Sequence, residues 1–189
     1  MTYYKELYSL EENHTQTDLK FYFVSTGAQN IVKAIHYQFF QKFEMENEHI
    51  LNGRNLFNLG FGDYDISSDT IYDDINSNNG DVRKVFYTVL STIPSFFELL
   101  EGNVIMVQGS DGRPEFVENC KASCTKKCEG DCKNFNRRIN IYKNFVDRHF
   151  TTLSVDYQFF GGNKAQNSNI SIEDYVPYKN YDSVFLIKK

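Results

Sequence analysis

The chain has 189 residues, of which 41% are hydrophobic and 24% are charged, and its formal net charge is −5. This apolar fraction is too high for a disordered chain, and no apolar run approaches the roughly 20 residues of a membrane-spanning helix. The first residues lack the basic start and the apolar stretch of a secretory signal, so we expect a cytoplasmic globular protein without a membrane partner.

Three strands are predicted after an N-terminal arm that covers residues 1–19. Aromatic and β-branched residues alternate over residues 21–25 and recur over residues 31–40, on either side of a Gly/Asn turn, which is typical of a β-hairpin. A third strand is expected over residues 55–61. Residues 62–81 are rich in Gly, Asp, Ser and Asn, which predicts a loop. Asp81 is expected to stabilise the first turn of the helix that follows this loop.

The clearest helix is predicted over residues 82–100, where apolar residues recur at i, i+3, i+4 and i+7. Pro94 is expected to kink this helix without ending it, because the apolar stripe continues beyond it. A buried strand over residues 104–107, a cysteine-rich segment over 115–134 and a second amphipathic helix over 135–150 follow. Strands are expected over residues 155–160, closed by Gly161 and Gly162, and over 184–187, with a mobile loop over 163–172.

These elements give the order β-β-β-α-β-α-β-β. We therefore predict an α+β fold, with a mainly antiparallel sheet and two principal helices packed on it, in a single domain over residues 20–189. The order is similar to that of ribonuclease H-like proteins, which is an analogy of fold alone. Those nucleases carry a carboxylate on their first strand, and residues 21–27 contain none.

All four cysteines, Cys120, Cys124, Cys128 and Cys132, lie within thirteen residues. A reducing compartment disfavours disulfides, and Zn²⁺ binds four thiolates at about 2.3 Å, so the cluster predicts a structural zinc site. On one straight helix Cys120 and Cys132 would lie about 18 Å apart, so the segment must fold back, with a turn at residues 129–131. Thiols packed in the core, redox pairs and an iron–sulfur cluster are the alternatives. Four protein ligands would leave no position for a catalytic water.

Basic residues gather around the cysteines, because residues 120–148 contain eight basic and three acidic side chains, a formal charge of +5. Such a surface could contact the phosphates of nucleic acid or an acidic protein; a solvated helix face is the alternative. At the Gly-rich turn that follows the strand over 104–107, exposed backbone amides could bind an anion, although an ordinary turn explains this sequence equally well. The candidate binding residues are Ser110, Arg113, Lys126, Lys127, Arg137 and Arg138.

Six aspartates between residues 63 and 81, with no basic residue between them, support a second hypothesis. Carboxylates can hold divalent cations, so a metal-dependent nuclease or phosphodiesterase would use Asp63, Asp65 and Asp111. Aspartates in loops more often form turns and helix caps, however.

The leading hypothesis is a non-enzymatic binding protein with structural zinc and a basic helical face. The third hypothesis is a purely protein-binding role, for example as a homodimer, in which the abundant Tyr and Phe side chains supply the contacts.

Several short motifs together resemble a known family. They are Asn-Asn-Gly-Asp at residues 78–81 with the apolar residues of 85–89, the strand that ends at Gly109 and Ser110 before Arg113, and the C-terminal Phe-Leu-Ile-Lys-Lys. Over residues 20–189 the chain resembles a family of uncharacterised bacterial proteins, common in Bacteroidota, with the cysteine-rich segment intervening after Arg113. No activity comes with this resemblance, which implies a bacterial cytoplasmic setting.

Overall fold

The computed structural model describes residues 6–15, 18–40, 45–46, 48–73, 79–112, 114–123, 128, 130, 132–164 and 169–189. Contacts between Cα atoms divide the chain into two compact units. Unit 1 comprises residues 1–40 and 57–103, and unit 2 comprises residues 41–56 and 104–189. Both units combine mostly antiparallel strands with helices, which confirms the predicted α+β class. The single domain expected over residues 20–189 stays a prediction.

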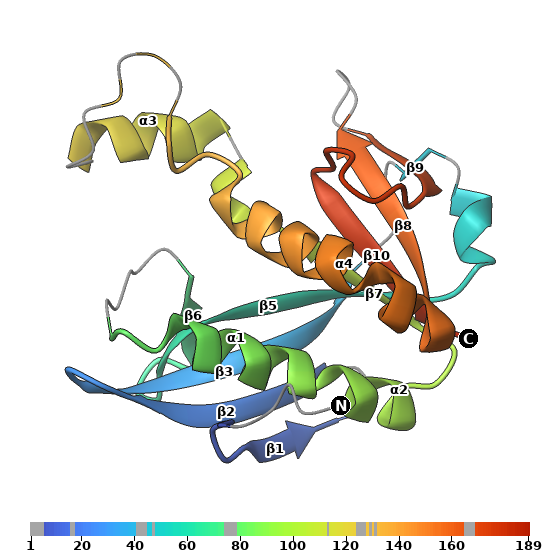
Figure 1. Ribbon diagram of the computed structural model, residues 1–189. Coiled ribbons are helices and arrows are strands. Elements are labelled where there is room, and N and C mark those ends of the chain that lie inside the picture. Colours follow the sequence, from blue (N-terminus) through green and yellow to red (C-terminus); the bar gives the residue numbers. More distant parts are fainter. Residues whose placement is uncertain are drawn as a thin grey trace. The chain divides into compact units, whose positions relative to one another are not determined.

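In unit 1, β1 (Glu11–His14), β2 (Asp18–Thr26), β3 (Asn30–Phe40) and β5 (Leu56–Asp65) are neighbours in that order, and β6 (Thr70–Tyr72) pairs with β5 (Figure 1). Strands β2 and β3 form the predicted hairpin, with Thr26 opposite Asn30 at its tip. The N-terminal arm contains β1, which pairs with β2. The loop predicted over residues 62–81 is wrong in part, because β5 continues to Asp65 and β6 runs antiparallel to it.

Two helices, α1 (Val82–Ser91) and α2 (Ile93–Leu99), replace the single kinked helix predicted over residues 82–100. They meet at Thr92, whose hydroxyl donates to the Val89 carbonyl at 2.7 Å. The Tyr37 hydroxyl of β3 lies 2.8 Å from the Thr92 hydroxyl and holds the break against the sheet. Pro94 lies in the first turn of α2, where the missing N–H leaves no helical hydrogen bond unmade. The prediction that Pro94 only kinks one helix is therefore wrong.

Aromatic rings fill the space between α2 and the strands of unit 1. Tyr37 stacks on Phe96 with ring centroids 4.7 Å apart, and Phe57 meets Phe96 edge-on at 5.4 Å. All three side chains are buried. The buried positions of β2 alternate with more exposed ones, as expected for a strand with one face on a core. These buried positions are Leu19, Phe21, Phe23 and Ser25.

The strands of unit 2 lie in the order β7 (Val104–Gln108), β10 (Ser183–Lys188), β8 (Tyr157–Lys164), β9 (Ile170–Asp174) and β4 (Met45–Glu46). Strand β10 is antiparallel to both β7 and β8, and β9 is antiparallel to β8, whereas β4 pairs parallel with β9. The 3-10 helices η1 (Glu48–Leu51) and η2 (Ser110–Gly112) and the helices α3 (Pro114–Ser123) and α4 (Arg137–Asp156) complete the unit. Helix α4 packs on β7, β8 and β10 (Figure 1).

Within the described residues, no helix has both the length and the apolarity needed to cross a membrane.

Gly161 and Gly162 lie inside β8 and do not close it as predicted. A Cβ at Gly161 would lie 2.1 Å from an atom of the Tyr181 ring, and a Cβ at Gly162 would lie 2.3 Å from the Ser183 hydroxyl. These glycines therefore let neighbouring side chains lie directly on the backbone of β8. Strand β9 also occupies part of the loop predicted over residues 163–172.

Replacing Gly161 by alanine is expected to lower the free energy of unfolding by about 1–3 kcal/mol, because the added methyl group would overlap the Tyr181 ring. Gly60→Ala is the matched control, since Gly60 also lies in a strand and a Cβ there would have no neighbour closer than 3.9 Å. We expect the control to be neutral or slightly stabilising. Urea denaturation measures both variants, and equal stabilities would contradict the close packing at Gly161.

Candidate functional site

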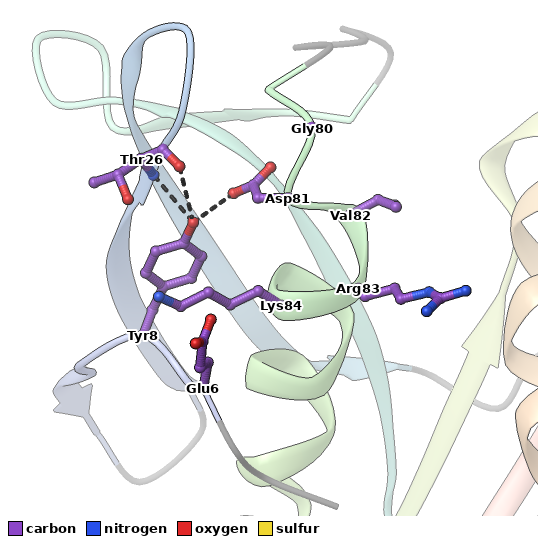
Figure 2. Close-up of a pocket in the computed structure, with 8 residues that line it drawn as sticks. All are labelled: Glu6, Tyr8, Thr26, Gly80, Asp81, Val82, Arg83 and Lys84. Carbon is purple, nitrogen blue, oxygen red and sulfur yellow. Dashed lines mark hydrogen bonds between the residues drawn. The ribbon is translucent and has the colours of Figure 1, made fainter.

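A hollow of about 520 Å³ in unit 1 lies between the N-terminal segment, the end of β2 and the start of α1. Its lining residues are Glu6, Tyr8, Thr26, Gly80, Asp81, Val82, Arg83 and Lys84. Figure 2 shows the Tyr8 hydroxyl directed toward Thr26 and Asp81, with the Arg83 side chain extending away from Tyr8. No local pattern connects Tyr8 with Asp81, which lies 73 residues further along the chain.

Tyr8 and Asp81 belong to one network of hydrogen bonds. The Tyr8 hydroxyl donates to Asp81 Oδ2 at 2.7 Å and accepts the Thr26 N–H at 3.1 Å. The Ser25 hydroxyl donates to the same Asp81 oxygen at 2.6 Å, and the Asn79 amide donates to the Ser25 hydroxyl at 2.9 Å. The Asp81 side chain makes no capping hydrogen bond to α1, the helix whose first turn it was predicted to stabilise, although the Asp81 carbonyl accepts the Val85 N–H at 3.0 Å. Its carboxylate instead connects α1 with β2 and the N-terminal segment.

Asn79 fixes the turn between β2 and β3. Its side-chain amide accepts the Gln29 N–H and donates to the Gln29 carbonyl, each at 2.9 Å. A Cβ at Gly27 would lie 2.2 Å from the Asn79 carbonyl oxygen, so glycine is needed there for this close approach. The Asn-Gly-Asp sequence at residues 79–81 therefore joins the hairpin to the start of α1.

The electrostatics of this hollow centre on Asp81 and Lys84. Partial burial raises the pKa of the Asp81 carboxyl, but hydrogen bonds from Ser25 and Tyr8 outweigh it and hold the pKa below its ordinary value. The Lys84 ammonium lies 4.1 Å from the centre of the Tyr8 ring, which is a cation–π contact. Tyr8 thus contacts an anion through its hydroxyl and a cation through its ring face.

The aspartates predicted for a metal-dependent nuclease are engaged in separate contacts. Asp63 of β5 forms a largely buried ion pair with Lys33 of β3. Asp65 accepts hydrogen bonds from the hydroxyl and the N–H of Ser67 at 2.6 and 2.8 Å, which lower its pKa and close the turn toward β6. Both belong to unit 1, whereas Asp111 belongs to unit 2. Among the residues that the structure describes, no group of three or more His, Cys, Asp or Glu side chains is arranged to hold a metal ion.

Asp111 is buried on η2, with 3% of its surface exposed, and supports the start of α4. Its Oδ2 accepts the Arg138 N–H at 2.8 Å, which satisfies one of the free donors in the first turn of the helix. The Arg138 guanidinium donates to the Ser110 hydroxyl at 2.6 Å. The structure therefore brings Ser110 and Arg138 together, and it uses them to hold α4 on η2.

The described cysteines lie on both arms of a fold-back. Cys120 is in α3, Cys128 and Cys132 follow that helix, and all three are half-buried. The Asn134 amide donates to Cys120 Sγ at 3.3 Å, so the chain returns to α3 two residues after Cys132. Four of the predicted site residues lie outside the described residues: Arg113, Cys124, Lys126 and Lys127.

Two charged residues of α4 are buried. Lys143 is 5% exposed, and its ammonium donates to the Lys179 carbonyl at 2.8 Å and to the Asn180 amide oxygen at 2.9 Å. Asp147, which is 8% exposed, accepts the Tyr178 N–H at 2.9 Å. Lys143 was counted in the predicted basic surface, but this lysine and Asp147 instead hold the loop between β9 and β10.

Because Lys143 and Asp147 are buried, they do not contribute to the exposed face of α4, and the charges that remain on this face are mostly basic. Arg137 and Arg148 are exposed, and Lys133 is exposed in the turn that precedes the helix. Of the two carboxylates in α4, Asp147 is buried and only Asp156, in the last position, is exposed. We name Lys133, Arg137 and Arg148 the basic face.

The lowered pKa of Asp81 predicts a pH-dependent contribution to stability. Since the pKa is lower in the folded chain, this contribution is present above the ordinary value of 3.8 and is lost as the pH falls through the folded value. Asp81→Asn is therefore expected to cost about 1–2 kcal/mol at neutral pH and progressively less below about pH 4. Urea denaturation of both proteins over a pH series checks this, and a difference that does not change with pH would refute it.

Part of the chain matches a known protein family. A family model, described as a family of unknown function (DUF6934), matches residues 4–114. No curated protein and no solved structure matches the chain, so the ribonuclease H-like order stays an analogy. The matched region contains Tyr8, Ser25, Asn79 and Asp81, whereas the cysteines lie beyond it. The chain therefore belongs to the DUF6934 family of unknown function.

Proposed function

We propose that the chain is a bacterial cytoplasmic binding protein and not an enzyme. In this proposal the cysteine segment, residues 120–132, holds a structural zinc ion, and the basic face contacts nucleic acid or an acidic partner. The observation that carries the proposal is the distribution of charge on α4. The helix exposes Arg137 and Arg148, buries Asp147, and exposes a carboxylate only at its last residue.

The geometry of the basic face suits a partner with several negative charges. Arg137 and Arg148 are eleven residues apart, so they lie on the same side of α4, about 16 Å from each other along its axis. The N-terminus of α4 adds a partial positive charge beside Lys133 and Arg137. Because Ser110 holds the Arg138 guanidinium, this arginine orients the start of the helix and is not needed as a partner contact.

A zinc ion would connect this face with α3. Zn²⁺ binds four thiolates in structural sites, and Cys120, Cys124, Cys128 and Cys132 supply that number from one segment. The hydrogen bond from Asn134 to Cys120 supports the fold-back that such a site requires. With the ion bound, the cysteine segment would fix the turn that carries Lys133.

The alternative, a metal-dependent nuclease, has less support. Its candidate ligand Asp63 is paired with Lys33, and Asp65 is engaged by Ser67. These contacts already engage Oδ1 of each carboxylate, so a cation would have to share that oxygen or use Oδ2 alone. The homo-oligomer hypothesis is compatible with either function and adds no residue to the basic face.

Protein purified without added metal or a metal-binding tag is expected to contain about one zinc ion per chain. Cys120→Ser is expected to lose most of this zinc, because thiolate coordination needs all four ligands. Asn134→Ala is the control, since it removes the contact to Cys120 and keeps all four thiols. Elemental analysis with thiol titration measures both, and zinc-free protein with four reactive thiols after denaturation would rule out the site.

Reversal of either exposed arginine of the basic face is expected to weaken binding about tenfold, as for the loss of one charge-assisted phosphate contact. The variants are Arg137→Glu and Arg148→Glu. Lys188→Glu is the control, because Lys188 is an exposed basic residue at the end of β10, lines neither hollow, and its reversal changes the net charge equally.

Fluorescence anisotropy with single-stranded RNA, duplex DNA and an acidic peptide measures the effect. Binding by the wild-type chain should also fall with rising salt, as counterion release requires. The proposal is contradicted if the folded Arg137→Glu variant binds with the same affinity as the wild-type chain. It is also contradicted if the wild-type chain binds none of the three probes.

A further inference from the structure

A second hollow, of about 210 Å³, lies in unit 2 between the first turns of α4, strand β8 and the loop between β9 and β10. Its lining residues are Asn136, Asn140, Asn163, Asn180, Tyr181 and Asp182. Four of the six are asparagines, and neither lysine nor arginine is among them. This lining favours a ligand that forms hydrogen bonds and carries no negative charge.

The Asn136 amide is available because another residue caps α4. Asn136 occupies the N-cap position, where an Asn side chain normally accepts an N–H of the first turn. It makes no such bond, and the Arg138 N–H is instead accepted by Asp111. Asn136 has a positive φ of 54°. Its Oδ1 lies close to Gly112, because a Cβ added to this glycine would be 2.3 Å from that oxygen. Asn136 therefore adopts a left-handed conformation, uncommon for residues other than glycine, at the edge of the hollow.

Asn140 and Asn163 add two more amides to the same space. Their side chains make no hydrogen bond to any other residue in the described part of the chain. Each amide offers both an N–H₂ donor and a carbonyl acceptor. Polar groups of both kinds therefore face the hollow from α4 and from β8.

The buried side chain of Lys143 holds the loop that forms the remaining wall of the hollow. The ammonium of Lys143 donates to the Asn180 amide oxygen and to the Lys179 carbonyl. Asp182 Oδ2 accepts the Lys164 N–H at 2.8 Å, which fixes the other end of this wall on β8. Because these contacts already hold the loop, ligand binding would not include the free-energy cost of ordering it.

We propose that this hollow binds one ring of a neutral sugar. Sugar hydroxyls donate and accept hydrogen bonds at once, which matches free amides and the Asp182 carboxylate. The volume is below the roughly 300–1,000 Å³ of typical ligand pockets and equals the share of about seven water molecules. A single ring fits this space better than an extended chain. The proposal is independent of the zinc ion and of the basic face, so either can fail without the other.

Titration calorimetry with glucose, galactose, mannose and N-acetylglucosamine tests this inference, with adenine as a neutral planar probe that has no sugar ring. At least one sugar is expected to bind with a Kd on the order of 1 mM. Asn140→Ala and Asn163→Ala are each expected to weaken it about tenfold, since each removes a donor and an acceptor. Asn144→Ala is the matched control, because Asn144 is exposed one turn further along α4 and does not line the hollow.

Wild-type affinity in the Asn144→Ala variant and loss in the other two would support the sugar site. The proposal is overturned if none of the four sugars binds saturably at about 10 mM, ten times the expected Kd. Tighter binding of adenine than of any of the sugars, or an equal loss in Asn144→Ala, would overturn it as well. Circular dichroism of each variant confirms that a loss of binding is not a loss of fold.

Discussion

The Asp111 carboxylate determines where α4 begins. From its buried place on η2 it accepts the Arg138 N–H, and Ser110 holds the side chain of the same arginine. Both surfaces for which we propose ligands depend on this contact, because it leaves the Asn136 amide at the small hollow and fixes Arg137 in the first exposed turn. A helix capped by its own Asn136 side chain would commit that amide to the backbone.

The sequence predicted those elements whose signal is local. Alternation of apolar residues was sufficient for the β2–β3 hairpin, and the helical period was sufficient for α1 and for α4 as far as residue 150; α4 continues to Asp156, where a strand was predicted from residue 155. The errors occur where distant residues decide the outcome. The break at Thr92 depends on Tyr37, 55 residues earlier, and Gly161 stays within β8 because the Tyr181 ring lies on it. In isolation, a Gly-Gly pair is more typical of a strand end.

The same distinction applies to the candidate sites. The four cysteines were evident because they lie in one segment. The fold-back was expected only if they bind one metal ion, which stays a prediction, and the contact between Asn134 and Cys120 is compatible with it. The burial of Lys143 could not be predicted, since its acceptors lie 36 and 37 residues away in a loop. Nothing in the local sequence pointed to Tyr8, because its role depends on a hydrogen bond to the distant Asp81.

The loop held by Lys143 and Asp147 has an unusual relation to solvent. The Tyr178 side chain is 78% exposed and its φ is 68°, yet its N–H is bonded to the buried Asp147 carboxylate. Exchange of this amide hydrogen with water therefore requires the loop to separate from α4. In terms of local unfolding, we therefore expect the loop around Tyr178 to open together with its contact to α4, although Tyr178 itself lies at the surface. A probe attached at Tyr178 would therefore report on the integrity of α4.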